Sequence, residues 1–355
     1  FRLSKYEKPL LDLLRGSPEM LQPDSRRNEM IAFVEGGLRD LSISRTSFDW
    51  GVKVPGSENH VMYVWVDALT NYLTGLGYPD ETAEMARFWP ADMHLIGKDI
   101  VRFHTVYWWA FLMSAGLPLP KLVYGHGFVL NRGRKESKSE GNVTDPIALA
   151  EQFGVDTLRY FLMSEVPFGR DGSYSPEAIV TRVNADLANS FGNLAQRSLS
   201  MVFKNMDGKL RGDCALTNAD EALLADVREA TDALVAKFDT LAFHEGLEAW
   251  MRGVFACNQY VDEMAPWVLR KTDPERMEAV LMVLLRCVRD LAIAVRPVVP
   301  GSAERLLDQL GIAADARDYA SLADHEWLST LANSGFTLKK PQGVFPRLEL
   351  AEGEG

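Results

Sequence analysis

The chain has 355 residues, of which 47% are hydrophobic and 25% are charged, a composition that excludes collagen-like, low-complexity and disordered chains. The length predicts about two or three domains. The formal net charge is −11. Proteins that bind nucleic acid non-specifically are usually basic overall, so any nucleic-acid surface of this chain must be local.

The three cysteines lie far apart in the sequence, at Cys214, Cys257 and Cys287, and form no Cys-x-x-Cys pair. This pattern argues against a disulfide framework or a zinc site and fits a reducing compartment. The apolar stretch 106–117 is too short to cross a bilayer, and the stretch 279–299 is interrupted by charged residues. We therefore expect a cytoplasmic protein that has no metal ligand set and does not enter membranes.

The first half of the chain alternates between helix-like and strand-like patterns. Apolar residues at helical spacing predict helices over 5–14 and 26–38, and β-rich apolar runs predict strands over 61–66, 94–97 and 121–124. Alternation of this kind indicates a parallel sheet, which binds ligands beyond the carboxyl ends of its strands. Polar residues follow each predicted strand, at Asp67, at 97–99 and at 125–127.

The second half is predicted to be helical. After Pro176, long helically periodic segments occupy 177–203, 218–238, 243–264 and 273–295, which favours a helical bundle. A short helix over 303–310 and an extended tail over 343–350 that folds back complete the prediction. The fold class is thus α/β followed by all-α.

A basic loop follows the strand-like residues 128–130. In the segment 133–142, Lys135 and Lys138 stand among Ser137, Ser139 and glycines. Two lysines can hold a polyphosphate as point charges, while small hydroxyl residues and loop N–H groups donate hydrogen bonds. The alternative is an ordinary solvated charged loop.

This loop resembles the Lys-Met-Ser-Lys-Ser signature of class I aminoacyl-tRNA synthetases, except that Glu136 stands where the family usually has Met. The segments 63–72 and 96–108 narrow the resemblance to methionyl-tRNA synthetases. The resemblance implies a methionine pocket lined by Trp65, Ala68, Leu69, Tyr72, Ile100, Phe103, His104 and Trp108. An aromatic cage suits a polarizable thioether. Because Ile100, Phe103 and His104 fall at helical spacing, a plain core face is the alternative.

The same resemblance implies an ATP site and a catalytic role for the two lysines. Gly97 and Asp99 would bind the ATP ribose, and the backbone near Val129 would meet the adenine. Lys138, helped by Lys135, would stabilise the leaving pyrophosphate. ATP with Mg²⁺ is the expected cofactor, and no zinc site is expected.

Two segments of the helical half resemble the family's anticodon-binding segments. Asn189, Asn193 and Arg197 are spaced four apart on one helix face and can read base edges, and Trp267 would stack on an unpaired base. The alternative is an amphipathic helix with a solvated polar stripe and an ordinary buried tryptophan.

The resemblance implies four regions and an activity. Residues 1–60 would end the connective insertion, 61–130 would form the second half of a Rossmann-type catalytic domain, 131–176 the stem-contact region with the lysine loop, and 177–355 the anticodon-binding bundle. The implied protein is a methionine–tRNA ligase acting on L-methionine and methionine tRNA, as a monomer or homodimer. The family's His-Ile-Gly-His signature is missing from this sequence, so we expect the first half of the catalytic domain to be a separate, cleaved or lost piece. The alternatives are a non-catalytic tRNA-binding fragment and a related synthetase for an aliphatic amino acid.

Overall fold

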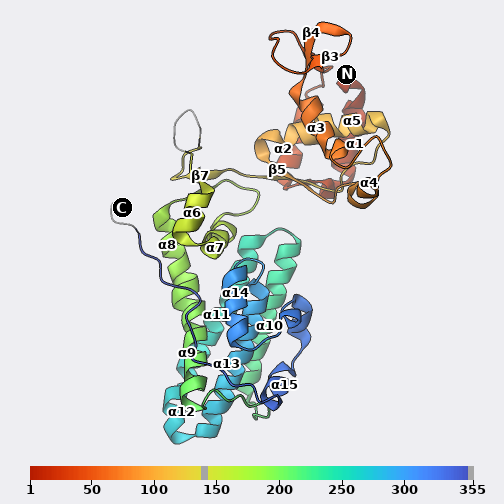
Figure 1. The fold of residues 1–355 in the computed structure, drawn as a ribbon. Helices are drawn as coiled ribbons and strands as arrows, with labels where there is room; N and C mark the ends of the chain where they lie inside the picture. Colours follow the sequence, from red (N-terminus) through yellow and green to blue (C-terminus); the bar gives the residue numbers. More distant parts are fainter. Residues whose placement is uncertain (137–142, 351–355) are drawn as a thin grey trace. The chain divides into compact units, whose positions relative to one another are not determined.

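A computed structural model describes residues 1–136 and 143–350 (Figure 1). The chain divides into two compact units. The first comprises Phe1–Phe128 with Gly169–Asp171, and the second comprises Val129–Phe168 with the chain from Gly172 onward. Each unit is described by itself.

The first unit contains a three-stranded parallel sheet in the order β1-β6-β5. Strand β5 (His94–Gly97) pairs with β6 (Val123–His126), with His94 opposite Val123. Both strands confirm predicted ones. Strand β1 (Leu21–Gln22) pairs in parallel with the other side of β6, opposite Val123 and Tyr124.

Helices α1 (Glu7–Gly16), α2 (Asp24–Glu35) and α5 (Trp109–Ala115) belong to the same unit as this sheet. Buried side chains from both the helices and the strands form one core, which includes Leu10, Leu14, Leu21, Met30, Val34, Ile96, Val106 and Val123. The first two helices confirm predicted ones. Residues 1–38 thus share a core with residues 96–123, and the boundary expected at residue 60 falls inside a strand.

The prediction of a parallel strand over 61–66 is wrong, both in the residues that form the strand and in the strands that pair with it. Strand β4 (Ser57–Met62) belongs to a small antiparallel sheet with β2 (Ser44–Arg45) and β3 (Lys53–Val54), and α3 (Val64–Thr74) begins two residues after it. A short apolar run cannot distinguish strand from helix, whereas Trp65, Leu69 and Leu73 repeat every four residues, as a helix requires. Asp67 consequently does not lie at a strand end. It lies in the first turn of α3, where the helix dipole stabilises a negatively charged carboxylate.

Shorter helical elements complete the first unit. Helix α4 (Ala83–Phe88) is capped by Thr82, whose side chain accepts a hydrogen bond from the backbone N–H of Met85. A 3-10 turn, η3 (Lys98–Ile100), follows β5, and a π-helix, η4 (Phe103–Trp108), leads into α5. Two further 3-10 turns, η1 (Leu3–Tyr6) and η2 (Pro18–Met20), flank α1.

The second unit begins with the parallel pair of β7 (Val129–Asn131) and β8 (Gly172–Tyr174), separated in sequence by α6 (Pro146–Phe153) and α7 (Val155–Glu165). Helix α8 (Pro176–Val183), the π-helix η5 (Asn184–Gly192) and α9 (Asn193–Asn205) then follow without a break. The remaining elements are α10 (Asn218–Asp239), α11 (Phe243–Met264), α12 (Pro266–Thr272), α13 (Pro274–Val295), α14 (Pro300–Gln309), η6 (Ala314–Ala316), η7 (Tyr319–Ala323) and α15 (Trp327–Asn333). The long helices confirm the predicted bundle.

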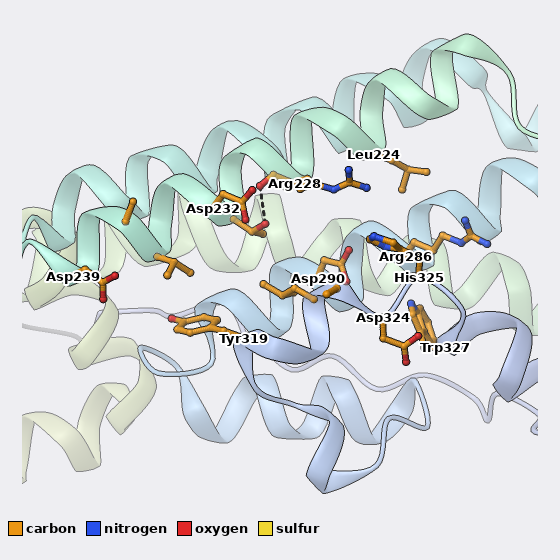
Figure 2. A pocket seen from close by; sticks show the side chains of 15 residues that line it. Leu224, Arg228, Asp232, Asp239, Arg286, Asp290, Tyr319, Asp324, His325 and Trp327 are labelled. Atoms are coloured by element: carbon orange, nitrogen blue, oxygen red, sulfur yellow. Dashed lines mark hydrogen bonds between the residues drawn. The ribbon is translucent and has the colours of Figure 1, made fainter.

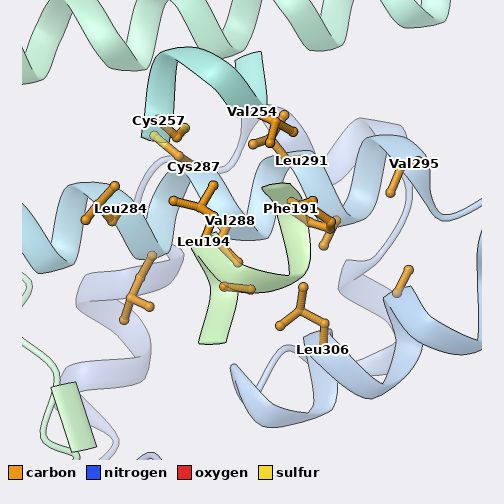
Figure 3. Packing of buried hydrophobic residues seen from close by; sticks show 14 of the residues in the cluster. Phe191, Leu194, Val254, Cys257, Leu284, Cys287, Val288, Leu291, Val295 and Leu306 are labelled. Carbon is orange, nitrogen blue, oxygen red and sulfur yellow. The ribbon is translucent and has the colours of Figure 1, made fainter. Parts of the chain in front are cut away.

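Helix α13 lies at the centre of this bundle. Sixteen of its 22 residues are buried, and it contacts α9, α10, α11, α12 and α14. Figure 3 shows Val288 and Leu291 of α13 among Phe191, Leu194 and Leu306 from its neighbours. Because almost every side of α13 faces protein, its polar residues need protein partners.

One such partner is Asp220, whose side chain is fully buried. Two guanidinium nitrogens of Arg276 on α13 donate to its carboxylate at 2.6 and 2.7 Å, and the Tyr260 hydroxyl on α11 donates to it as well. Burial opposes ionisation, but the bonds from Arg276, from the backbone of Thr217 and from Tyr260 lower the pKa of Asp220 to about 2. The carboxylate thereby joins α10, α11 and α13.

Arg289, also on α13, holds the segment 319–327. Its side chain is 1% exposed and donates to Asp290 at 2.8 Å, to the Asp324 carbonyl at 3.3 Å and to the Ser321 carbonyl. The guanidinium carbon lies 5.3 Å from the centre of the Trp327 ring. A buried cation thus satisfies two backbone carbonyls of a segment that is only partly helical.

Among the residues that the structure describes, no helix is long and apolar enough to cross a membrane.

We predict that Arg289→Met destabilises the helical unit by about 3–5 kcal/mol, because it leaves Asp290 and two carbonyl oxygens without their donor. Urea unfolding at pH 7, followed by circular dichroism, measures this. The control is Arg211→Met, which removes a half-exposed arginine 2.8 Å from Glu278 and should cost only about 0–1 kcal/mol. Equal losses in the two variants would contradict the role of Arg289.

The pH dependence of unfolding gives a second readout at the same place. Burial raises the pKa of Asp290 to about 6, against the opposing influence of Arg289. A carboxyl whose pKa is raised by folding stabilises the folded state below its unfolded pKa, and this contribution is lost as the pH rises through about 6. Asp290→Asn should therefore flatten the change in unfolding free energy between about pH 4 and pH 6.

Candidate functional site

Helix α3 and the π-helix η4 bring aromatic side chains together in the first unit. The Trp65 ring stacks on Phe103 with centroids 4.0 Å apart and an interplanar angle of 9°. The Tyr72 hydroxyl lies 2.9 Å from His104 Nε2, and His104 Nδ1 lies 3.0 Å from the Ile100 carbonyl. The tautomer that donates to the carbonyl leaves Nε2 to accept from Tyr72, which fixes both side chains.

His94 belongs to this aromatic cluster, although it is not among the predicted site residues. Its ring stacks on Tyr72 with centroids 4.2 Å apart, and its centroid lies 5.9 Å from that of His104. It is 5% exposed, and within the described residues neither of its ring nitrogens has a hydrogen-bond partner. Its place at the start of β5 was the only sequence signal, and it identified a strand residue rather than a site residue.

Both histidines are neutral at pH 7. Burial lowers the pKa of His94 to about 4, with a further contribution from nearby His104. Burial also lowers the pKa of His104, although its bond to Ile100 acts in the opposite direction. The cluster is therefore an uncharged aromatic surface, which favours an apolar, polarizable ligand group over a charged one.

The eight residues predicted to line a methionine pocket differ in how they take part in the cluster. Trp65, Tyr72, Phe103, His104 and Trp108 take part in ring contacts of the cluster. Leu69 and Trp108 are at most 1% exposed and pack in a small core with Leu73, Trp89 and Leu112, so they support the cluster from behind. Ala68 is exposed on α3. Ile100 takes part through its backbone carbonyl, which is hydrogen-bonded to His104 Nδ1.

The π-helix changes the predicted helical spacing around His104. Ile100 lies in the 3-10 turn η3, whereas Phe103–Trp108 form a π-helix with wider turns. π-Helical turns are rare and frequently occur at functional sites. This geometry, which sequence periodicity does not reveal, presents Phe103, His104 and Trp108 to α3.

Gly97 and Asp99 lie together at the carboxyl end of β5. A Cβ on Gly97 would come within 2.7 Å of Asp99 Oδ1, so only glycine allows the carboxylate to approach the backbone this closely. Asp99 is exposed. Lys98, between them, instead pairs with Asp171 at 2.7 Å and lies 4.6 Å from the centre of the Phe128 ring. The predicted pair thus leaves a carboxylate open to a ligand.

The remaining predicted ATP and catalytic residues belong to the second unit. Val129 begins β7 and is exposed, and Lys135 follows the turn after β7 and is also exposed. Lys138, with Ser137 and Ser139, falls in 137–142 and lies outside the described residues.

The residues predicted to read an anticodon lie on three helical elements of the second unit. Asn189 on η5 and Asn193 on α9 are exposed. The Arg197 guanidinium carbon lies 5.5 Å from the centre of the Trp267 ring on α12, and Arg197 is 3.5 Å from Asp262. Trp267 is 46% exposed, so the alternative of an ordinary buried tryptophan is wrong. An exposed indole beside a guanidinium suits a stacked base.

A cavity of about 590 Å³ lies elsewhere, between α10, α13 and the segment 319–327 (Figure 2). Arg228, Arg286 and His325 line it together with Asp232, Asp290 and Asp324. None of the predicted site residues lines it, and its mixed charges match no single ligand class. Within 1–136 and 143–350 we find no group of three His, Cys, Asp or Glu residues arranged to hold a metal ion.

Comparison with known proteins finds two matching families. Residues 1–199 match the family described as "tRNA synthetases class I (M)", and residues 212–354 match "Anticodon binding domain of methionyl tRNA ligase". The fold class predicted from the sequence, α/β followed by an all-α anticodon-binding bundle, is confirmed.

Individual relatives are similar along nearly the whole chain. "Methionine--tRNA ligase" of Brucella suis biovar 1 is 56% identical over 98% of this chain and 66% of its own length. The protein of the same description from Mycobacterium bovis is 53% identical over 98% of this chain and 67% of its own length.

A solved structure titled "Mycobacterium tuberculosis methionyl-tRNA synthetase in complex with methionyl-adenylate" superposes with a TM-score of 0.91 at 53% identity, covering 98% of this chain and 68% of that one. The chain thus spans about two thirds of the length of the curated relatives that it matches. The chain belongs to the methionyl-type family of class I tRNA synthetases.

Proposed function

We propose that the protein is a methionine–tRNA ligase, which activates methionine with ATP and transfers it to the 3′ end of methionine tRNA. The observation that carries the proposal is the neutral aromatic cluster of Trp65, Tyr72, Phe103 and His104. It shares a unit with the open carboxylate of Asp99. A similar solved structure, from Mycobacterium tuberculosis, is a complex with methionyl-adenylate.

The cluster would select methionine by dispersion and shape. A thioether gains sulfur–aromatic contact with the rings of Trp65, Phe103 and Tyr72, worth about 0.3–1.5 kcal/mol for each contact. The neutral histidines add polar atoms without a charge, so a lysine or glutamate side chain would lose its hydration with no compensating partner. Leu69 and Trp108 would keep the rings in place from behind.

The adenylate-forming step would place charge on the departing phosphates. A methionine carboxylate oxygen attacks the α-phosphorus, the bond from that phosphorus to the bridging oxygen breaks, and pyrophosphate leaves with the negative charge. The Asp99 carboxylate beside Gly97 would accept hydrogen bonds from the ribose hydroxyls, and the backbone of Val129 would contact the adenine. Lys135 and Lys138 would bind the pyrophosphate together with the Mg²⁺ that accompanies ATP.

The transfer step requires that the correct tRNA is bound and that its 3′ end is placed beside the adenylate. The terminal ribose hydroxyl attacks the methionyl carbonyl, and AMP leaves with the electron pair of the broken mixed-anhydride bond. Asn189, Asn193, Arg197 and Trp267 would recognise unpaired anticodon bases by hydrogen bonds and stacking.

We further propose that the enzyme works in the cytoplasm as a monomer or homodimer. The relatives are longer than this chain. The part that they have in addition would supply the His-Ile-Gly-His signature and the carboxylate for the methionine amino group. Two alternatives stay open: a tRNA-binding fragment without catalysis, and a synthetase for an aliphatic amino acid.

We predict methionine-dependent exchange of pyrophosphate into ATP, with leucine, isoleucine and valine at least about 100-fold lower in kcat/KM. Purified protein is assayed with each amino acid, and the intact mass of every polypeptide in the sample is recorded. Exchange with an aliphatic amino acid instead of methionine would select the third interpretation. Absence of exchange together with retained binding of methionine tRNA would select the non-catalytic one.

Lys138→Ala is expected to lower kcat of this exchange by about 100-fold, because it removes a cation from the developing pyrophosphate charge. The KM for methionine should change little, since the lysine does not contact the amino acid. Lys8→Ala, which removes an exposed lysine on α1, is the control. A Lys138 effect confined to the methionine KM would contradict this role.

Trp267→Ala should lower kcat/KM for aminoacylation by about tenfold or more, because base stacking of about 1–3 kcal/mol is lost. Pyrophosphate exchange should be unchanged, and Trp267→Phe should keep part of the activity. Trp50→Ala, at a tryptophan that is 87% exposed in the first unit, serves as the matched control. Parallel losses in both reactions would remove the anticodon assignment.

A further inference from the structure

The most unusual residue of the lysine loop is Glu136, which stands where the family usually has methionine. It is half-buried rather than solvated, and its carboxylate has specific partners. The hydroxyls of Tyr174 and Thr144 each lie 2.6 Å from Glu136 Oε1, and these two hydroxyls are also in contact with each other. The Asn131 amide donates to Thr144 Oγ1 at 3.1 Å.

These partners come from the strand pair β7–β8. Asn131 ends β7, Tyr174 ends β8, and the two residues are paired in register. After β7 the chain turns at Arg132 and Gly133, which both have positive φ, and the Asn131 N–H then donates to the Arg134 carbonyl at 2.9 Å. The Gly133 N–H donates to the Ser173 hydroxyl at 2.8 Å. The turn directs the following residues back toward β8, where Glu136 meets Tyr174.

Glu136 and Thr144 stand on either side of the segment 137–142 in the sequence. The hydrogen bond from Thr144 to Glu136 therefore links the described residues on the two sides of this stretch. Tyr174, which is 7% exposed, connects Glu136 to the end of β8.

The protonation states suit this arrangement. Burial opposes ionisation of Glu136, but the bonds from Thr144 and Tyr174 lower the pKa of its carboxyl. Burial and the carboxylate together raise the pKa of Tyr174 to about 12. At neutral pH an ionised acceptor thus faces two neutral hydroxyl donors, which is the stronger class of hydrogen bond.

We propose that Glu136 is a positioning residue that ties the two ends of the lysine loop to the β7–β8 pair through Tyr174 and Thr144, and so sets where Lys135 meets the ATP phosphates. The positioning of Lys135 rests on the proposed function, whereas the anchoring by Glu136 does not. Both hydroxyls bind the same oxygen of the Glu136 carboxylate, so this negatively charged group is held beside the ends of β7 and β8.

Limited trypsin digestion tests the anchor without requiring activity. Tyr174→Phe removes one hydroxyl and leaves the sequence around Arg134, Lys135 and Lys138 unchanged. It should accelerate cleavage at these sites about tenfold, as expected when a hydrogen bond to a charged group is lost. Tyr319→Phe, which removes a hydroxyl that donates to the Ala294 carbonyl in the same unit, should leave the rates unchanged. Unchanged cleavage in Tyr174→Phe, with the circular dichroism and melting temperature of the wild type, would overturn the anchor.

Kinetics of pyrophosphate exchange tests the consequence for ATP. Glu136→Ala should lower kcat about tenfold with an unchanged methionine KM, and Glu136→Gln, whose carbonyl oxygen still accepts both hydroxyls, should restore most of it. The double variant Glu136→Ala with Tyr174→Phe should be no slower than Glu136→Ala alone. Additive losses, or full activity in Glu136→Ala, would overturn the positioning role. If the wild type shows no exchange, the proposed function fails, while the digestion still decides the anchor.

Discussion

The enclosure of α13 is the constraint on which the helical unit depends. A helix that faces protein on nearly every side must bury apolar residues around its whole circumference, and every polar group on it must be paired. Arg276 in the first turn of α13 and Arg289 further along it are paired through their terminal guanidinium nitrogens. The partly buried Arg276 binds the Asp220 carboxylate at the start of α10, and the buried Arg289 binds backbone carbonyls of the segment before α15. These contacts link α13 to the elements around it.

The same principle explains which parts could be predicted from the sequence. Long periodic segments such as 218–238 and 243–264 appear nearly as expected, because burial of a helix face imposes a repeat that can be read directly. Strand β1 has two residues and hence no repeat at all. The run 61–66 resembles a strand because apolar residues dominate it, whereas the spacing of Trp65, Leu69 and Leu73 favours a helix over the residues that follow Tyr63.

The candidate site shows a similar limit. The resemblance to methionyl-tRNA synthetases identified Gly97 with Asp99 and Tyr72 with His104 as site residues, and the structure brings each pair together. His94 is not among the predicted site residues because its role comes from tertiary packing, which sets its ring at the start of β5 against Tyr72 on α3. The exposure of Trp267 could not be read from its sequence neighbours either, since only the packing of α12 beside Arg197 determines it.

The two π-helices also bear on how this chain compares with relatives of different length. In η5, Gly192 closes the wide turn, and a Cβ there would lie 2.7 Å from the Leu187 carbonyl oxygen. At the other end of η5 the Asn184 amide holds the backbone of Leu348 by two hydrogen bonds. A π-turn contains one residue more than an α-turn, so the segment behaves as a one-residue insertion accommodated within a helix. In a regular α-helix one extra residue would rotate everything beyond it by about 100°, and the wide turns of η5 absorb part of this rotation. Gap placement within 184–192 is therefore a structural question, and an alignment that ignores it would equate side chains on different faces.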